Sequence, residues 1–70
     1  MEAVIRIDHE TYTIDADVAS LEELQARLHS SMVRGDVDQL WLADGSRMSV
    51  NWRAVRRVTV LTQGGLTPNE

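Results

Sequence analysis

One amphipathic helix is the strongest structural signal in the sequence, and it limits what the chain can fold into. Ser20 and Glu23 have the spacing of a capping box, in which a hydroxyl and a carboxylate each accept a hydrogen bond from a free backbone N–H. Gly35 can adopt the left-handed conformation that ends a helix. Between them runs an apolar stripe made by Leu21, Leu24, Leu28 and Met32. The sequence therefore predicts one helix over 21–34, whose leucine-rich side must pack against another layer.

Two segments before the helix alternate between apolar and polar residues, with the period of half-buried strands. The apolar residues that share a face are Ala3, Ile5 and Ile7 in 3–8, and Tyr12 and Ile14 in 11–15. A short polar break, Asp8-His9-Glu10, separates the two segments. We therefore predict that they pair as a β-hairpin.

A second hairpin is predicted after the helix, from segments 39–43 and 46–50 around the turn signal Asp44-Gly45. A two-residue turn would put Leu40 and Leu42 on the face of Arg47 and Ser49, because side chains alternate between the two faces of a strand. A three-residue loop over 43–45 instead gives one apolar face, made by Leu40, Leu42, Met48 and Val50. We predict the three-residue loop, with Gly45 in a left-handed conformation.

The three-residue loop has a consequence for the opposite face of this hairpin. It places Trp41 across from Arg47, close enough for a cation-π contact. After Val50 the alternation stops, and Asn51 is well placed to cap a single helical turn over 51–54. Segment 56–62 then resumes a strand pattern.

These elements predict an α+β fold in the order ββαβββ, with one helix packed on a mostly antiparallel sheet. We assign residues 1–62 to a single domain and 63–70, which contain two glycines and the only proline, to a C-terminal tail. With 70 residues and no cysteine, the core is small and has no covalent staple. Self-association is therefore expected.

The charge of the chain is divided between its two ends. Residues 1–45 hold ten acids and three arginines, a net charge of −7, whereas residues 46–70 hold four arginines and one acid, a net charge of +3. An acidic total argues against nucleic acid as a general partner, because that binding neutralises many phosphates. The basic end suits an acidic protein partner or the acidic part of another copy.

The sequence contains no pattern that indicates catalysis, a metal or a cofactor. His9 and His29 lie in different predicted elements, and no Gly-x-Ser-x-Gly sequence marks a nucleophile. The Asp15/Asp17 and Asp36/Asp38 pairs fall at opposite ends of the helix, where they suit turns and caps. The N-terminus has no signal-like apolar run and no segment approaches about 20 apolar residues, so we expect a cytoplasmic protein without membrane contact.

One cluster of side chains suggests a binding surface. Arginine together with aromatic residues is typical of the anchors of protein interfaces. The cluster consists of Trp41, Arg47, Trp52, Arg53, Arg56 and Arg57. Two other interpretations stay open: a solvated strand edge whose charges prevent unwanted pairing, and a surface for single-stranded nucleic acid.

The element order, with a final strand running into Gly64-Gly65, resembles the ubiquitin-like β-grasp fold and the small sulfur carriers of thiamine and molybdopterin biosynthesis. The layout is also similar to that of short actinobacterial proteins of unknown function. The resemblance to the carriers implies that the carboxylate of Gly65 is adenylated and thiocarboxylated. Because 66–70 follow here, that chemistry would require trimming after Gly65.

Two functional hypotheses follow from these observations. The first is a non-enzymatic module for protein interaction or regulation that forms a homodimer through the arginine and tryptophan cluster. The second is a sulfur carrier that acts through Gly64 and Gly65. The partner of the first is a protein or a second copy, and neither hypothesis needs a cofactor.

Overall fold

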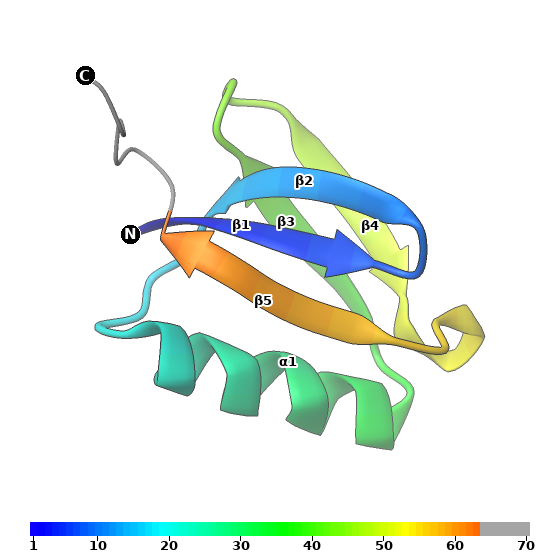
Figure 1. Cartoon of the computed structure of the whole chain (residues 1–70). Helices are drawn as coiled ribbons and strands as arrows, with labels where there is room; N and C mark the ends of the chain where they lie inside the picture. The colour runs from blue at the N-terminus through cyan, green and yellow to red at the C-terminus, as the bar shows by residue number, and fades with distance from the viewer. Residues whose placement is uncertain (64–70) are drawn as a thin grey trace.

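The computed structural model describes residues 1–63, and these form a five-stranded sheet with one helix on it (Figure 1). The elements in chain order are β1 (Glu2–Ile7), β2 (Glu10–Asp15), α1 (Leu21–Arg34), β3 (Val37–Leu42), β4 (Arg47–Asn51), the 3-10 turn η1 (Trp52–Ala54) and β5 (Val58–Gln63). The predicted α+β class and ββαβββ order are confirmed. The last strand begins two residues later and ends one residue later than the predicted 56–62.

The strands are arranged in the order β4-β3-β2-β1-β5, and every neighbouring pair is antiparallel. β1 and β2 pair along their whole length around the turn at Asp8 and His9, as the sequence predicts. β2 and β3 pair only at Ile14 with Leu42 and at Asp15 with Trp41. The β3–β4 hairpin therefore diverges from the other three strands and runs across them (Figure 1).

The core lies between α1 and the sheet face that looks toward it. Its buried members are Ala3, Ile5, Ile7, Ile14, Leu24, Leu28, Val50 and Trp52. Leu24 and Leu28 are the centre of the predicted helix stripe, and Leu21 and Met32 pack at its ends, half-buried. The strand residues are those that the alternation predicts, so the packing of the leucine-rich helix side on an apolar sheet face is confirmed.

Both ends of α1 are set by the residues that the sequence indicates. The Ser20 hydroxyl accepts a hydrogen bond from the Glu23 N–H at 3.1 Å, and a carboxylate oxygen of Glu23 accepts one from the Ala19 N–H at 3.2 Å. At the other end Gly35 has a φ of 70° and donates its N–H to the carbonyls of Ser31 and Met32. These contacts satisfy backbone groups that would otherwise have no partner, which explains why the helix begins and ends there.

The loop between β3 and β4 has three residues, which confirms its predicted length. Leu42 donates its N–H to the Ser46 carbonyl at 2.8 Å, and Gly45 has a φ of 92°. Asp44 accepts hydrogen bonds from both the hydroxyl and the N–H of Ser46, at 2.6 and 2.9 Å. These two bonds favour the charged form, and they lower the pKa of the Asp44 carboxyl from its ordinary value of 3.8.

Candidate functional site

The structure separates the predicted arginine and tryptophan cluster into four places. Trp41 and Arg47 lie together on the sheet face that points away from α1. Trp52 lies in the core, Arg53 lies beside the end of α1, and Arg56 and Arg57 lie at the β1–β2 turn. The six residues therefore do not form one surface.

The expectation that Trp52 belongs to an exposed surface is wrong. Its side chain is 1% exposed, and its indole N–H donates a hydrogen bond to Asp38 at 2.9 Å. Its backbone N–H also donates to the Asp36 carbonyl at 2.9 Å. The η1 turn is capped by the Asn51 side chain, as predicted, and it directs the indole into the core near α1. Trp52 therefore stabilises the fold and is not available to a partner.

Arg53 lies next to the C-terminal end of α1. A Cβ atom placed on Gly35 would come within 3.4 Å of the Arg53 side-chain nitrogen Nε. Arg53 is exposed, but it is turned toward the helix end and not toward Trp41. Its cation is well placed near the free carbonyls that end α1.

Trp41 and Arg47 form the cation-π pair that the sequence predicts. They are directly opposite each other on β3 and β4, and the Arg47 guanidinium carbon lies 5.1 Å from the centre of the indole ring. Arg47 also donates to the side chain of Gln39 at 3.3 Å, which holds its guanidinium over the ring. Trp41 keeps 53% of its surface exposed. This pair is an aromatic and cationic patch on the outer sheet face.

The edge of the sheet beside this patch is uncovered. β4 is the last strand of the sheet, and within residues 1–63 no helix or strand other than β3 packs closely along it. Hydrogen-bonded and non-bonded residue pairs alternate along an antiparallel ladder. The hydrogen bond between Leu42 and Ser46 makes theirs a bonded pair, so the next pair, Trp41 with Arg47, is non-bonded. The N–H and C=O groups of Arg47, Ser49 and Asn51 consequently point away from β3, toward solvent.

The opposite edge of the sheet is protected by the helix. α1 lies along β5 (Figure 1), and the side chain of Gln25 accepts a hydrogen bond from the Val60 N–H at 3.2 Å. This contact occupies a backbone donor that an added strand would need. β4 is thus the edge that the described part of the chain leaves free for pairing.

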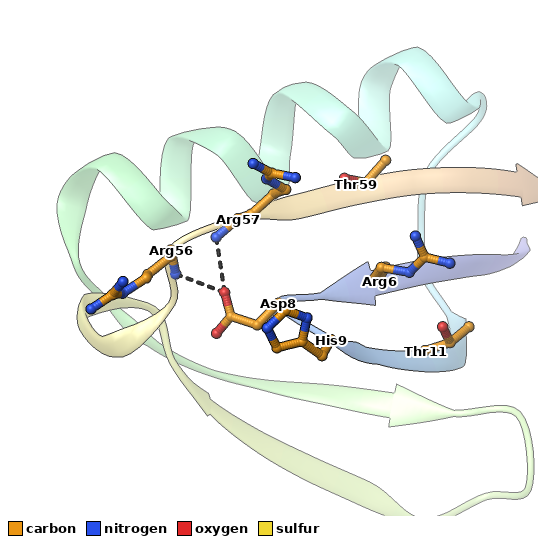
Figure 2. A pocket seen from close by; sticks show the side chains of 7 residues that line it. All are labelled: Arg6, Asp8, His9, Thr11, Arg56, Arg57 and Thr59. Carbon is orange, nitrogen blue, oxygen red and sulfur yellow. Dashed lines mark hydrogen bonds between the residues drawn. The ribbon is translucent and has the colours of Figure 1, made fainter.

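A second feature is an open depression at the β1–β2 turn (Figure 2). Asp8 shapes it: one carboxylate oxygen accepts hydrogen bonds from the backbone N–H groups of Arg56 and Arg57, each at 3.0 Å. Asp8 also donates its own N–H to the Arg57 carbonyl at 2.8 Å. These three bonds tie the segment before β5 to the turn. The arginine side chains are left to point into solvent.

Three arginines surround this depression, which we call the turn cradle. Its lining residues are Arg6, Asp8, His9, Thr11, Arg56, Arg57 and Thr59. The strand register explains the arrangement, because Arg6 on β1 is paired with Thr11 on β2 and with Thr59 on β5. Arg6 therefore stands between two threonine side chains on the outer sheet face, as Figure 2 shows.

Sequence reasoning missed Arg6, Asp8, Thr11 and Thr59. A two-residue turn at Asp8 and His9 already implies that Arg6 faces Thr11, so half of the turn cradle was accessible from the hairpin pattern. The other half depends on the pairing of β5 with β1, between residues about fifty positions apart in the chain. No local pattern indicates that pairing.

The remaining residues considered in the sequence do not come together. His9 lies in the turn cradle and His29 lies exposed on α1. Within residues 1–63 no three side chains of the metal-binding types gather in one place, and no helix has the length and apolar character to cross a bilayer. Gly64 and Gly65 lie outside the described residues.

Comparison of the chain with protein-family models, with curated proteins and with solved structures found no match.

Proposed function

We propose that this protein is a non-enzymatic interaction module that forms a homodimer by pairing the β4 edges of two copies. The uncovered backbone of β4 is the single observation that supports this proposal most. An exposed strand edge is a template for another strand, and main-chain hydrogen bonds are the main source of affinity in such pairing. The covered β5 edge directs pairing to β4.

The sequence of β4 is compatible with pairing to itself. An antiparallel pair centred on Ser49 places the outward backbone groups of Ser49 opposite those of Ser49 in the partner subunit. Arg47 then stands opposite Asn51 of the partner subunit, so no like charges meet directly. On the core side, Met48 comes opposite Val50 of the partner subunit, and two apolar side chains meet. Registers shifted by two residues would bring either the Gly45 turn or the η1 turn into the pair and lose hydrogen bonds.

The patch of Trp41 and Arg47 lies next to the β4 edge that would pair in such a dimer, because Arg47 is the first residue of β4. Trp41 holds the Arg47 guanidinium through the cation-π contact at 5.1 Å. Ordering of this side chain before association lowers the entropy that binding must overcome. We therefore assign the two residues to the rim of the proposed interface.

The test is a Ser49→Pro substitution, which removes the central N–H of the β4 edge. Proline is tolerated on an edge strand where its nitrogen faces solvent, so the monomer should still fold. We expect the dimer dissociation constant, measured by sedimentation equilibrium, to rise at least about tenfold. Ser49→Ala keeps the N–H and should leave association unchanged, and Trp41→Ala should weaken it by a few fold.

Circular dichroism of the same samples checks that each variant is folded. A wild-type chain that stays monomeric at high concentration would contradict the proposal. A Ser49→Pro variant that dimerises as well as wild type would also contradict it, because edge pairing cannot survive that loss.

The sulfur-carrier hypothesis is the alternative, and the residue at which β5 ends is the observation that favours it. β5 runs to Gln63, so the diglycine follows directly where the described strand ends. Intact-mass spectrometry of protein from its native host tests this alternative. A species that ends at Gly65, or one that carries a thiocarboxylate there, is expected if the chain is a carrier. Detection of the full-length chain alone would rule it out.

A further inference from the structure

We propose that the turn cradle binds a phosphate group, free or carried on a small molecule. This inference is independent of the dimer, because no residue of the turn cradle belongs to β4. Trp41, which is paired with Arg47, is also paired with Asp15 on β2. Asp15 is in turn paired with Glu2 at the start of β1. Arg6 lies four residues further along β1, which is about 13 Å at the rise of a strand.

The charge of the turn cradle differs in sign from that of the whole chain. Three arginines and one aspartate give it a net charge of +2, whereas the chain carries −4. The ion pairs within residues 1–63 involve the N-terminal amine, Arg27 and Arg34, and none involves an arginine of the turn cradle. Positive charge without an internal partner attracts an anion from solution.

The aspartate cancels only one of the three positive charges. Asp8 directs one carboxylate oxygen to the N–H groups of Arg56 and Arg57, so its charge is already hydrogen-bonded to the backbone. The same bonds hold the two arginine positions beside β1. The guanidinium groups remain free to bind a ligand.

The donors match the chemistry of a phosphate. Arg6 offers several N–H groups in one plane, which suit two oxygens of a phosphate, and Thr11 and Thr59 offer hydroxyls on either side of it. Arg57 also lines the depression and adds a further positive charge to it. The depression has a volume of about 720 Å³ and is open to solvent, so it has room for the group that carries the phosphate.

The test is a titration of the full-length protein followed by amide NMR spectra. The probes are inorganic phosphate, O-phosphoserine and adenosine monophosphate, with sodium chloride at matched ionic strength as the reference. We expect saturable shifts at Arg6, Thr11, Arg57 and Thr59 with at least one phosphate probe and no such shifts with chloride. The probe that binds most tightly identifies what carries the phosphate.

Arg6→Gln should weaken this binding at least about tenfold, because it removes the charged, two-pronged donor. Arg53→Gln is the matched control: it makes the same charge change outside the turn cradle and should alter the affinity less than twofold. Thr59→Val, which keeps the side-chain shape and removes one hydroxyl, should weaken binding by a few fold.

Two results would overturn the proposal. One is the absence of saturable shifts at these amides with all three phosphate probes. The other is an equal loss of affinity in Arg6→Gln and Arg53→Gln, since this would show that only the overall charge matters. The spectrum of each variant without ligand shows whether it is folded.

Discussion

Replacing Trp52 with alanine should lower the free energy of unfolding by about 3–5 kcal/mol, the range found when a large buried aromatic side chain is truncated. Trp52 is 1% exposed and is among the largest fully buried side chains. A domain of this size is stabilised by only about 5–10 kcal/mol in total. The variant should therefore lose a large part of its stability and unfold at a much lower urea concentration than wild type.

The measurement is urea denaturation followed by circular dichroism, at one protein concentration for all variants. Trp41→Ala is the matched control, because it removes the same side chain from a position that is 53% exposed. That change should alter the free energy of unfolding by less than about 1 kcal/mol. Equal losses in the two variants would contradict the assignment of one indole to the core and the other to the surface.

A second variant separates packing from hydrogen bonding at the same position. Trp52→Phe keeps most of the apolar volume but leaves the half-buried Asp38 carboxylate without the indole N–H. A lost hydrogen bond to a charged group costs about 1–3 kcal/mol. We expect Trp52→Phe to fall between wild type and Trp52→Ala.

The elements of this fold were largely predictable because their ends are set by local chemistry. Ser20 and Gly35 fix the helix through contacts within four residues of each end. The left-handed backbone of Gly45 favours a loop of three residues between β3 and β4. A loop with an odd number of residues places Trp41 opposite Arg47. In each case the residue type and the spacing restrict the backbone directly, so a pattern in the sequence is sufficient.

The burial of Trp52 was not predictable in the same way. Arg53 lies within the η1 turn and two further arginines follow it, which suggests an exposed segment, and a single helical turn is too short to show an apolar face. The indole packs in the apolar core, and Asp38, fourteen residues earlier, accepts its N–H so that no buried donor lacks a partner. Such a contact depends on how β3, α1 and η1 pack together, and this information is not local.

The turn cradle shows the same limit at a candidate binding site. The hairpin pattern brings Arg6 to Thr11, but Thr59 and Arg57 arrive through the pairing of β5 with β1. The cluster predicted from the sequence therefore contained arginines that are close together in the chain. The fold instead combines two of them with Arg6, which lies about fifty residues away.

Replacing Asp8 with alanine should lower the free energy of unfolding by about 2 kcal/mol, although the residue lies in a surface turn. The carboxylate accepts two backbone N–H groups at 3.0 Å, and a hydrogen bond to a charged group contributes about 1.5–3 kcal/mol net. Both bonds are exposed to solvent, so we expect the lower part of this range for the pair. Asp8 also has a φ of 54°, a conformation that aspartate tolerates better than alanine.

Two further variants separate these causes, with urea denaturation again as the measurement. Asp8→Asn keeps an acceptor and tolerates the left-handed backbone, so it should lose less than about 1 kcal/mol. Asp8→Gly relieves the backbone but removes the acceptor, so it should retain most of the loss. If Asp8→Gly were as stable as wild type, the two hydrogen bonds would contribute nothing, and the arginine segment would need another contact to hold it beside β1.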